Sequence, residues 1–190
     1  MSAALQKPMD VEQFLAWEER QELRFEFDGL RAIARTGGTG AHAAIQVGLL
    51  GALGNHLRGK RPRAFGSGLR IKMSGSVRYP DAFVICTPVS PAATFATEPA
   101  VIFEILSKST AREDFGAKHG EYAAIATLQR YVLLQQTHSA AFVFSRTTEG
   151  WDYQFIYGAD AILDMPEIGV AIPLGEIYED IVLESDPAAG

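Results

Sequence analysis

Residues 77–122 constrain the fold more than any other part of the chain. This stretch contains two apolar runs of strand character, and each run carries one acidic residue where an apolar side chain is expected. Asp81 follows Pro80 at the start of the run AFVIC, and Glu104 interrupts the run VIFEIL. An unpaired carboxylate is costly to bury in a low-dielectric interior, and two neighbouring ones repel each other. The pattern therefore predicts two adjacent strands whose carboxylates share a divalent cation.

The remaining patterns predict a mixed α/β (α+β) fold, with helices packed on a central mixed sheet. Helical periodicity covers residues 11–18, 41–57 and 110–126. Strand patterns cover residues 23–27, 30–35, 63–65, 69–73, 77–86, 101–106, 130–135, 140–146 and 151–157. Asp10 with Gln13 forms a capping box for the first helix, and Thr110 is the expected N-cap of the third. The run at 101–106 is almost wholly apolar, which indicates a central strand buried on both faces.

The length of 190 residues and the hydrophobic content of 47% are typical of one globular domain over residues 1–190, with a flexible tail after about residue 183. No apolar run reaches the roughly 18–20 residues of a transmembrane helix. The N-terminus has no apolar signal core. The single cysteine, Cys86, excludes an intrachain disulfide. Together these features predict a cytoplasmic protein without membrane contact.

The charges are unevenly distributed along the chain. Its net charge is −6, yet residues 58–78 contain seven basic residues and no acid, whereas residues 149–190 contain ten acids and no base. Either the two regions are solvated faces that pair with each other, or the basic region faces phosphates. On the second interpretation, the candidate nucleic-acid-binding residues are Arg58, Lys60, Arg61, Arg63, Arg70 and Lys72.

Further polar residues can complete a site around the two central acids. Asp114, Lys118 and Tyr122 recur at intervals of four and share one stripe of the third helix, which can lie over Glu104. Glu26 lies on the polar face of the strand at 23–27, so it is either exposed to solvent or a third acid at the site. His42 and His56, near the ends of the second helix, are assigned surface or capping roles, because no His/Cys spacing resembles a zinc site.

These motifs together resemble a known family. The dipeptide Pro80-Asp81 followed by the strand acid Glu104 is the layout of the PD-(D/E)XK nuclease superfamily. The segments FEFDG, YPDAFVIC, EPAVIFEILSKSTARED and LQRYVLLQQ, and the closing GVAIPLGEIYED, are similar to the bacterial putative restriction endonuclease family within it. The resemblance runs from the first helix to about residue 181.

The resemblance implies a restriction-endonuclease-like fold, a Mg²⁺-dependent phosphodiesterase site in which Mn²⁺ can substitute, DNA as substrate, and a homodimer. It implies Asp81 and Glu104 as catalytic metal ligands and Glu26 as a further acid near the metal. The motif's lysine position is occupied by Leu106, and the family likeness transfers this role to Lys118, with Asp114 and Tyr122 in support. Lys108 is the alternative.

Two other functions remain open at this level. One is a catalytically inactive nuclease-fold module for binding or regulation, which predicts an acid pair that is already neutralised. The other is a metal-dependent hydrolase of small phosphates, which needs a closed pocket. The residue after His42 is Ala43, where a polar residue is common in the family, and this weakens the case for a role of the second helix's start.

Overall fold

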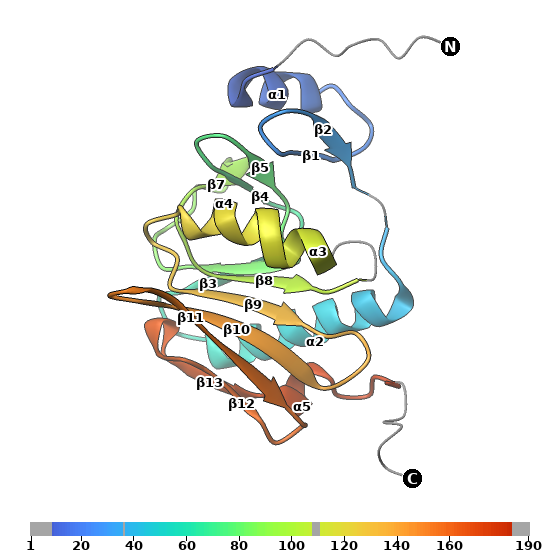
Figure 1. Ribbon diagram of the computed structural model, residues 1–190, viewed down its shortest axis with the longest axis vertical. Coiled ribbons are helices and arrows are strands. Elements are labelled where there is room, and N and C mark those ends of the chain that lie inside the picture. Colours follow the sequence, from blue (N-terminus) through green and yellow to red (C-terminus); the bar gives the residue numbers. More distant parts are fainter. Residues whose placement is uncertain (1–8, 36, 108–110, 184–190) are drawn as a thin grey trace.

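The computed structural model describes residues 9–35, 37–107 and 111–183 (Figure 1). Its centre is a mixed sheet with the strand order β11-β10-β9-β8-β6-β3. The strands are β3 (Arg63–Gly66), β6 (Ala82–Ile85), β8 (Pro99–Ile105), β9 (Arg130–Leu134), β10 (Ala140–Thr147) and β11 (Gly150–Tyr157). Strand β8 pairs antiparallel with β6 and parallel with β9, and all its residues are buried. The expected mixed central sheet and its buried central strand are therefore confirmed.

A second sheet with the order β2-β1-β5-β4-β7 lies beside the first, toward the N-terminal end of the molecule (Figure 1). Its short strands are β1 (Phe25–Phe27), β2 (Ala32–Ala34), β4 (Arg70–Lys72), β5 (Val77–Arg78) and β7 (Phe95–Ala96). Helix α1 (Val11–Glu18) packs on this sheet through a small cluster that contains Phe14 and Phe27, whose rings stack 5.0 Å apart. The capping box of Asp10 and Gln13 is present at the start of α1, as expected.

Helical elements cover both faces of the six-stranded sheet (Figure 1). One face packs on α2 (Gly40–His56), on α5 (Leu174–Ile177) and on the hairpin of β12 (Ile162–Met165) and β13 (Val170–Pro173), which the 3₁₀ turn η2 (Pro166–Ile168) joins. Helix α2 approaches α5 closely at Gly48, where a Cβ atom would clash with the carbonyl oxygen of Ile177. The other face packs on the segment of α3 (Ala111–Glu113), the π-helical turn η1 (Asp114–Lys118) and α4 (His119–Ala123).

The expected continuous strand over residues 77–86 is wrong, because the chain changes sheets within it. Strand β5 belongs to the five-stranded sheet and β6 to the six-stranded one. Between them, Pro80 has no backbone N–H to donate to a ladder. The backbone N–H of Tyr79 donates to Oε1 of Glu26 at 3.0 Å, so it is not available to a strand partner either. This crossing point places Asp81 at the junction of the two sheets.

The expected continuous α-helix over residues 110–126 is also corrected. Over its described part it is interrupted by the π-helical turn η1, and regular helix ends at Ala123. The end is stabilised by Arg146, whose Nη2 donates to the carbonyl oxygens of Ala123 and Ile125 at 2.8 Å each. These bonds satisfy carbonyl groups that a helix terminus leaves without partners.

Three further expectations concern residues outside the ranges that the structure describes. The N-cap at Thr110, the alternative lysine Lys108 and the tail after about residue 183 all lie beyond the described ranges. Within those ranges, no helix is both long and apolar enough to span a bilayer.

Candidate active site

Asp81 and Glu104 emerge on the same face of the six-stranded sheet. Ala82 of β6 is in register with Phe103 of β8, so the next position along the antiparallel pair brings Asp81 opposite Glu104. The alternation of side chains agrees, because Phe83 and Ile102 belong to the core on the α4 side. Both acids are nearly inaccessible, with 4% and 3% of their surface exposed. The two acids that the sequence singles out are thus neighbours in the structure.

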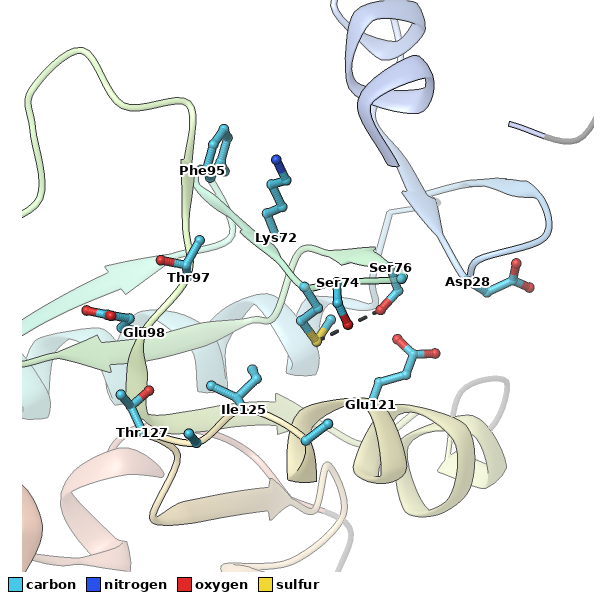
Figure 2. A pocket seen from close by; sticks show the side chains of 14 residues that line it. Asp28, Lys72, Ser74, Ser76, Phe95, Thr97, Glu98, Glu121, Ile125 and Thr127 are labelled. Carbon is cyan, nitrogen blue, oxygen red and sulfur yellow. Dashed lines mark hydrogen bonds between the residues drawn. The ribbon is translucent and has the colours of Figure 1, made fainter. Parts of the chain in front are cut away.

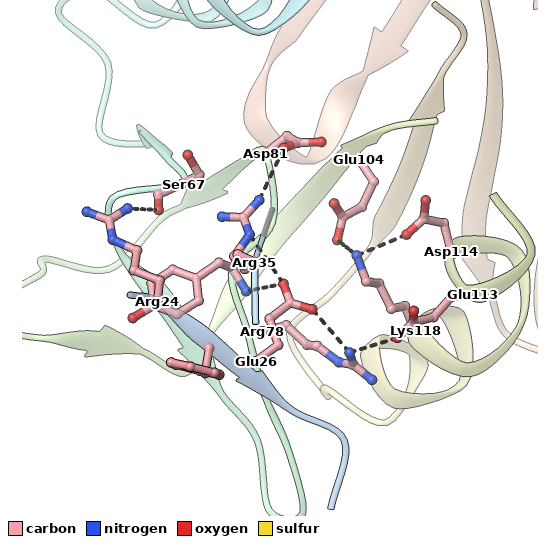
Figure 3. Close-up of polar contacts among 12 residues, drawn as sticks. Arg24, Glu26, Arg35, Ser67, Arg78, Asp81, Glu104, Glu113, Asp114 and Lys118 are labelled. Atoms are coloured by element: carbon pink, nitrogen blue, oxygen red, sulfur yellow. Dashed lines mark hydrogen bonds and ion pairs between the residues drawn. The ribbon is translucent and has the colours of Figure 1, made fainter. Parts of the chain in front are cut away.

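Lys118 reaches Glu104 from the π-helical turn that crosses this face (Figure 3). Its Nζ lies 3.1 Å from Oε1 of Glu104 and 2.9 Å from Oδ1 of Asp114. The hydroxyl of Tyr122 donates to the same Oε1 at 3.0 Å. The helical stripe of Asp114, Lys118 and Tyr122 therefore lies over Glu104, and all three side chains are buried.

The environment of Glu104 favours its protonated form. Burial raises the pKa of this carboxyl group to about 8. The Lys118 ammonium opposes the rise, whereas the charges of Asp81, Asp114 and Glu26 add to it. For Lys118, burial alone would lower the pKa, but Glu104, Glu26 and Asp114 outweigh it and hold the pKa above its ordinary value. Lys118 is thus protonated and lies among several acidic side chains. A further cation would relieve the electrostatic repulsion among these acids.

Asp81 is held by groups from three different elements. Its Oδ2 accepts the backbone N–H of Ile105 at 2.8 Å and lies 3.1 Å from Nε2 of His42, in the first turn of α2. Its Oδ1 lies 3.6 Å from Nη2 of Arg35, just after β2. The surface or capping role expected for His42 is therefore wrong. Its position at the start of the helix was the only signal in the sequence.

Glu26 is buried and is linked to Asp81 through Arg35, so it is not exposed to solvent. Its Oε2 accepts from Nη1 of Arg78 at 3.1 Å. Arg78, with 1% of its side chain exposed, also binds Glu113 at 2.9 Å and Glu121 at 2.8 and 2.6 Å. One guanidinium thus ties β1 to α3 and α4. Sequence reasoning counted Arg78 only as part of a basic region, although its position three residues before Asp81 placed it in the same segment.

The donor set suits a hard divalent cation. Mg²⁺ takes oxygen ligands and usually needs only one or two protein carboxylates, with water and substrate oxygens completing the shell. Among the described residues, Oε2 of Glu104 accepts no hydrogen bond, and Oδ1 of Asp81 has only the loose contact with Arg35. These two oxygens on one face are the available ligands. Within the same residues no group of three or more His, Cys, Asp or Glu side chains is arranged to hold a metal ion.

The six residues expected to bind nucleic acid differ in how exposed they are. Arg70 has a buried side chain that pairs with Glu18, so its expected contact with DNA is corrected. Lys72 pairs with Glu12 and lies over the ring of Phe95. The remaining four, Arg58, Lys60, Arg61 and Arg63, are exposed beyond the C-terminal end of α2. His42 is at the opposite end of that helix, on the order of 20 Å away at 1.5 Å per residue.

Other cations lie much closer to the acids. The guanidinium groups of Arg24 and Arg35 both lie against the ring of Tyr79, at 5.6 and 5.7 Å from its centroid. Arg24 donates to the carbonyl oxygen of Ser67 at 2.8 Å (Figure 3). Neither arginine was assigned to the site from the sequence, because their segment offered only an alternation of apolar and polar residues.

A separate cleft of about 730 Å³ opens beside the network of ion pairs around Arg78 (Figure 2). Apolar groups of Met73, Phe95 and Ile125 contribute to its wall, together with the acids Glu98 and Glu121. Glu121 is the one residue that the cleft shares with the Arg78 network. Asp81 and Glu104 do not line it, so the acids form a site of their own.

A mixed sheet that presents two buried carboxylates beside a lysine is the arrangement expected of a nuclease-like protein. The Uma2 family, described as "Putative restriction endonuclease", matches residues 11–174. The protein slr1290 of Synechocystis sp., named as uncharacterized, is 32% identical over 91% of this chain and 93% of its own length. A second protein of the same organism, sll1609, likewise named as uncharacterized, is 30% identical over 72% of this chain and 80% of its own. The chain therefore belongs to the Uma2 putative restriction endonuclease family.

A solved structure shares the fold. The crystal structure of a protein from Anabaena variabilis, named as a putative nuclease belonging to DUF820, aligns with a TM-score of 0.75. The alignment covers 90% of this chain and 98% of that chain at 19% sequence identity. The expected family and the expected fold class are both confirmed.

Proposed function

We propose that this protein is a Mg²⁺-dependent endonuclease that hydrolyses phosphodiester bonds of DNA, with Mn²⁺ as a substitute. The observation that carries the proposal is the convergence of Asp81, Glu104 and Lys118 on one face of the central sheet, in a chain of this family. When bound, the cation supplies Lewis-acid polarisation of the phosphate and lowers the pKa of a water molecule.

The protein's own groups have distinct roles in this proposal. Asp81 and Glu104 would hold the cation through Oδ1 and Oε2, which accept no hydrogen bond from the described residues. The Lys118 ammonium, kept protonated by its acidic neighbours, stabilises negative charge that develops near Glu104. Asp114 fixes the position of Lys118, and Tyr122 fixes the rotamer of Glu104. Glu26 completes the acid cluster without being a required ligand.

DNA as substrate is supported by cations at two distances from the acids. Arg24 and Arg35 lie near the site, and the exposed residues Arg58, Lys60, Arg61 and Arg63 lie one helix length away, where they could contact a neighbouring stretch of backbone. Each phosphate contact contributes a slope of about −0.9 to the dependence of log affinity on log salt concentration. Replacing Arg61 and Arg63 by Glu should reduce that slope, and an unchanged slope removes them from the DNA path.

The test of the function is Mg²⁺-dependent nicking of supercoiled plasmid by the wild type, Asp81→Asn and Glu104→Gln. Nicking by the wild type and a loss of at least about a hundredfold in both variants support the proposal, because such a loss exceeds roughly 2.7 kcal/mol of barrier. Equal rates in all three proteins would show that the activity belongs to a contaminant or to another site.

A second candidate is a non-catalytic binding module, and one observation favours it. The acids of the site already have internal cationic partners, with Lys118 on Glu104 and Arg35 on Asp81. On this alternative, the protein binds DNA without cleaving it and has no affinity for divalent cations. Hydrolysis of small phosphates receives less support, since the cleft of about 730 Å³ is lined by residues other than Asp81 and Glu104.

We also retain the homodimer as a proposal. Strand β11 is an edge of the central sheet and exposes Tyr153, Phe155 and Tyr157, which alternate along it and so share one face. Exposed aromatic side chains on an unprotected edge strand favour pairing with another chain. Sedimentation of wild type and Phe155→Lys tests this, with Leu30→Lys on another exposed apolar residue as control. A dimer lost only in Phe155→Lys supports the proposal, and a monomeric wild type contradicts it.

A further inference from the structure

Arg35 differs from Arg78 and Lys118, the other cationic partners of Glu26, Asp81 and Glu104 among the described residues, in how it is held. Its Nη2 lies 3.6 Å from Oδ1 of Asp81 and its Nε lies 3.9 Å from Oε1 of Glu26. Both separations exceed hydrogen-bond length. By contrast, the bonds of Arg78 to Glu26 and of Lys118 to Glu104 are 3.1 Å each. Arg35 therefore neutralises two acids by charge alone.

Arg35 is also the most accessible of these cations. Its side chain is 27% exposed, compared with 1% for Arg78 and 8% for Lys118. The ring of Tyr79 supports its guanidinium from one side. A group that is held loosely at the solvent edge of a buried acid cluster can move away without breaking a hydrogen-bonded network.

The oxygen that Arg35 neutralises is one of the two oxygens available to a divalent cation. Oδ2 of Asp81 is taken by Ile105 and His42, which leaves Oδ1 facing Arg35. Two cations cannot both occupy the space beside one oxygen without strong repulsion. A metal ion that binds Oδ1 must therefore displace the guanidinium.

We propose that Arg35 is an exchangeable counter-ion of Asp81 and Glu26, which a divalent cation displaces and which then binds a phosphate oxygen of the nucleic acid. The inference rests on the proposed function: its first half on the divalent-cation site, its second half on the nucleic-acid substrate. Arg24 lies against the same Tyr79 ring as Arg35, so a displaced Arg35 would join a second guanidinium group at the rim of the site. Paired guanidinium groups match the geometry of a phosphate.

Removal of this one arginine should therefore strengthen metal binding. Calorimetric titration with Mn²⁺ should show roughly tenfold tighter binding to Arg35→Met than to the wild type, since a competing positive charge is removed. Arg35→Lys, which keeps the charge, should stay near the wild-type affinity. Arg24→Met is the matched control, because Arg24 packs on the same ring but bonds a carbonyl oxygen of Ser67. Its affinity should change less than about twofold by the same Coulomb argument.

A second measurement uses the unaltered protein and so does not depend on how a variant folds. Phenylglyoxal modifies accessible guanidinium groups, and mass spectrometry reports the rate at each arginine. Addition of Mg²⁺ should accelerate modification of Arg35 and leave the rate at Arg24 unchanged. Slower modification of Arg35 with Mg²⁺, or an unchanged rate, would contradict displacement.

The outcomes separate this inference from the proposed endonuclease. If Mn²⁺ binds Arg35→Met more tightly but the wild type does not nick plasmid, the counter-ion exchange stands and the endonuclease fails. If Mn²⁺ binds Arg35→Met equally or more weakly, the exchange fails whether or not the wild type cleaves DNA. If Mn²⁺ binds none of the proteins, both the exchange and the metal dependence are wrong.

Discussion

Arg78 and Glu121 form a two-point ion pair, in which Nε and Nη2 of the arginine lie 2.8 and 2.6 Å from the two carboxylate oxygens. Such a fork is among the stronger polar contacts in proteins. Here it joins the five-stranded sheet to α4, and the same guanidinium reaches Glu26 and Glu113. It therefore holds the helical segment that carries Lys118 against the sheet.

Loss of this guanidinium should destabilise the protein strongly. Arg78→Met removes the shared cationic partner of one buried and two partly exposed carboxylates, and breaking such a network typically costs about 3–5 kcal/mol. Urea denaturation monitored by circular dichroism measures this change. Arg31→Met is the control, because its pair with Asp28 has a 75% exposed arginine and should contribute at most about 1 kcal/mol. Equal decreases in the free energy of unfolding in both variants would mean that the Arg78 network stabilises the protein no more than an exposed ion pair does.

The stability of the metal-free protein should fall as the pH rises from about 4.5 to about 8. The pKa of Glu104 is raised from 4.5 to about 8 on folding, so between these values the folded state binds more protons than the unfolded state. Each unit of such a shift corresponds to about 1.4 kcal/mol. Unfolding free energies from urea titrations across this range test the sign.

Two controls tie the pH dependence to Glu104. In Glu104→Gln the fall should be much shallower, since the titrating group is gone. Saturating Mg²⁺ should also flatten it in the wild type, because a bound cation favours the charged carboxylate. A steep fall that persists in Glu104→Gln would assign the titration to another residue.

Lys118→Met should reduce plasmid nicking by at least about a hundredfold, as expected when a group that stabilises transition-state charge is lost. Mn²⁺ affinity should be retained, because Lys118 is not a ligand in the proposed site. Lys108→Ala, the alternative lysine from the sequence, should nick at nearly the wild-type rate. Active Lys118→Met with inactive Lys108→Ala would reverse the assignment.

The sequence predicted the central acids well because burial makes an isolated carboxylate conspicuous. Asp81 and Glu104 interrupt apolar runs, which predicted that the two carboxylates meet, and the register of β6 with β8 places them on one face. The helical stripe of Asp114, Lys118 and Tyr122 was recognisable for a similar reason, since a spacing of four fixes one side of a helix.

The sequence did not predict the partners that come from distant segments. His42 and Arg35 reach Asp81 only because the chain crosses between two sheets at Pro80, and that crossing lay within one expected strand. The burial of Arg70 was missed for a related reason. Its position on the polar side of a strand indicated solvent, but α1 covers it and supplies Glu18 as its partner. Contacts of this kind depend on tertiary packing, which the periodicity of a short sequence segment does not reveal.

The central claim is that Asp81 and Glu104 hold a divalent cation, and the most direct measurement is calorimetric titration of the apoprotein with Mn²⁺ and Mg²⁺. The wild type should bind one ion per chain, whereas Asp81→Asn should lose at least about tenfold in affinity because one ligand charge is removed. Asp28→Asn, an acid of the β1–β2 turn that pairs with Arg31, should match the wild type. Binding of equal strength in Asp81→Asn, or no binding to the wild type, would contradict the account.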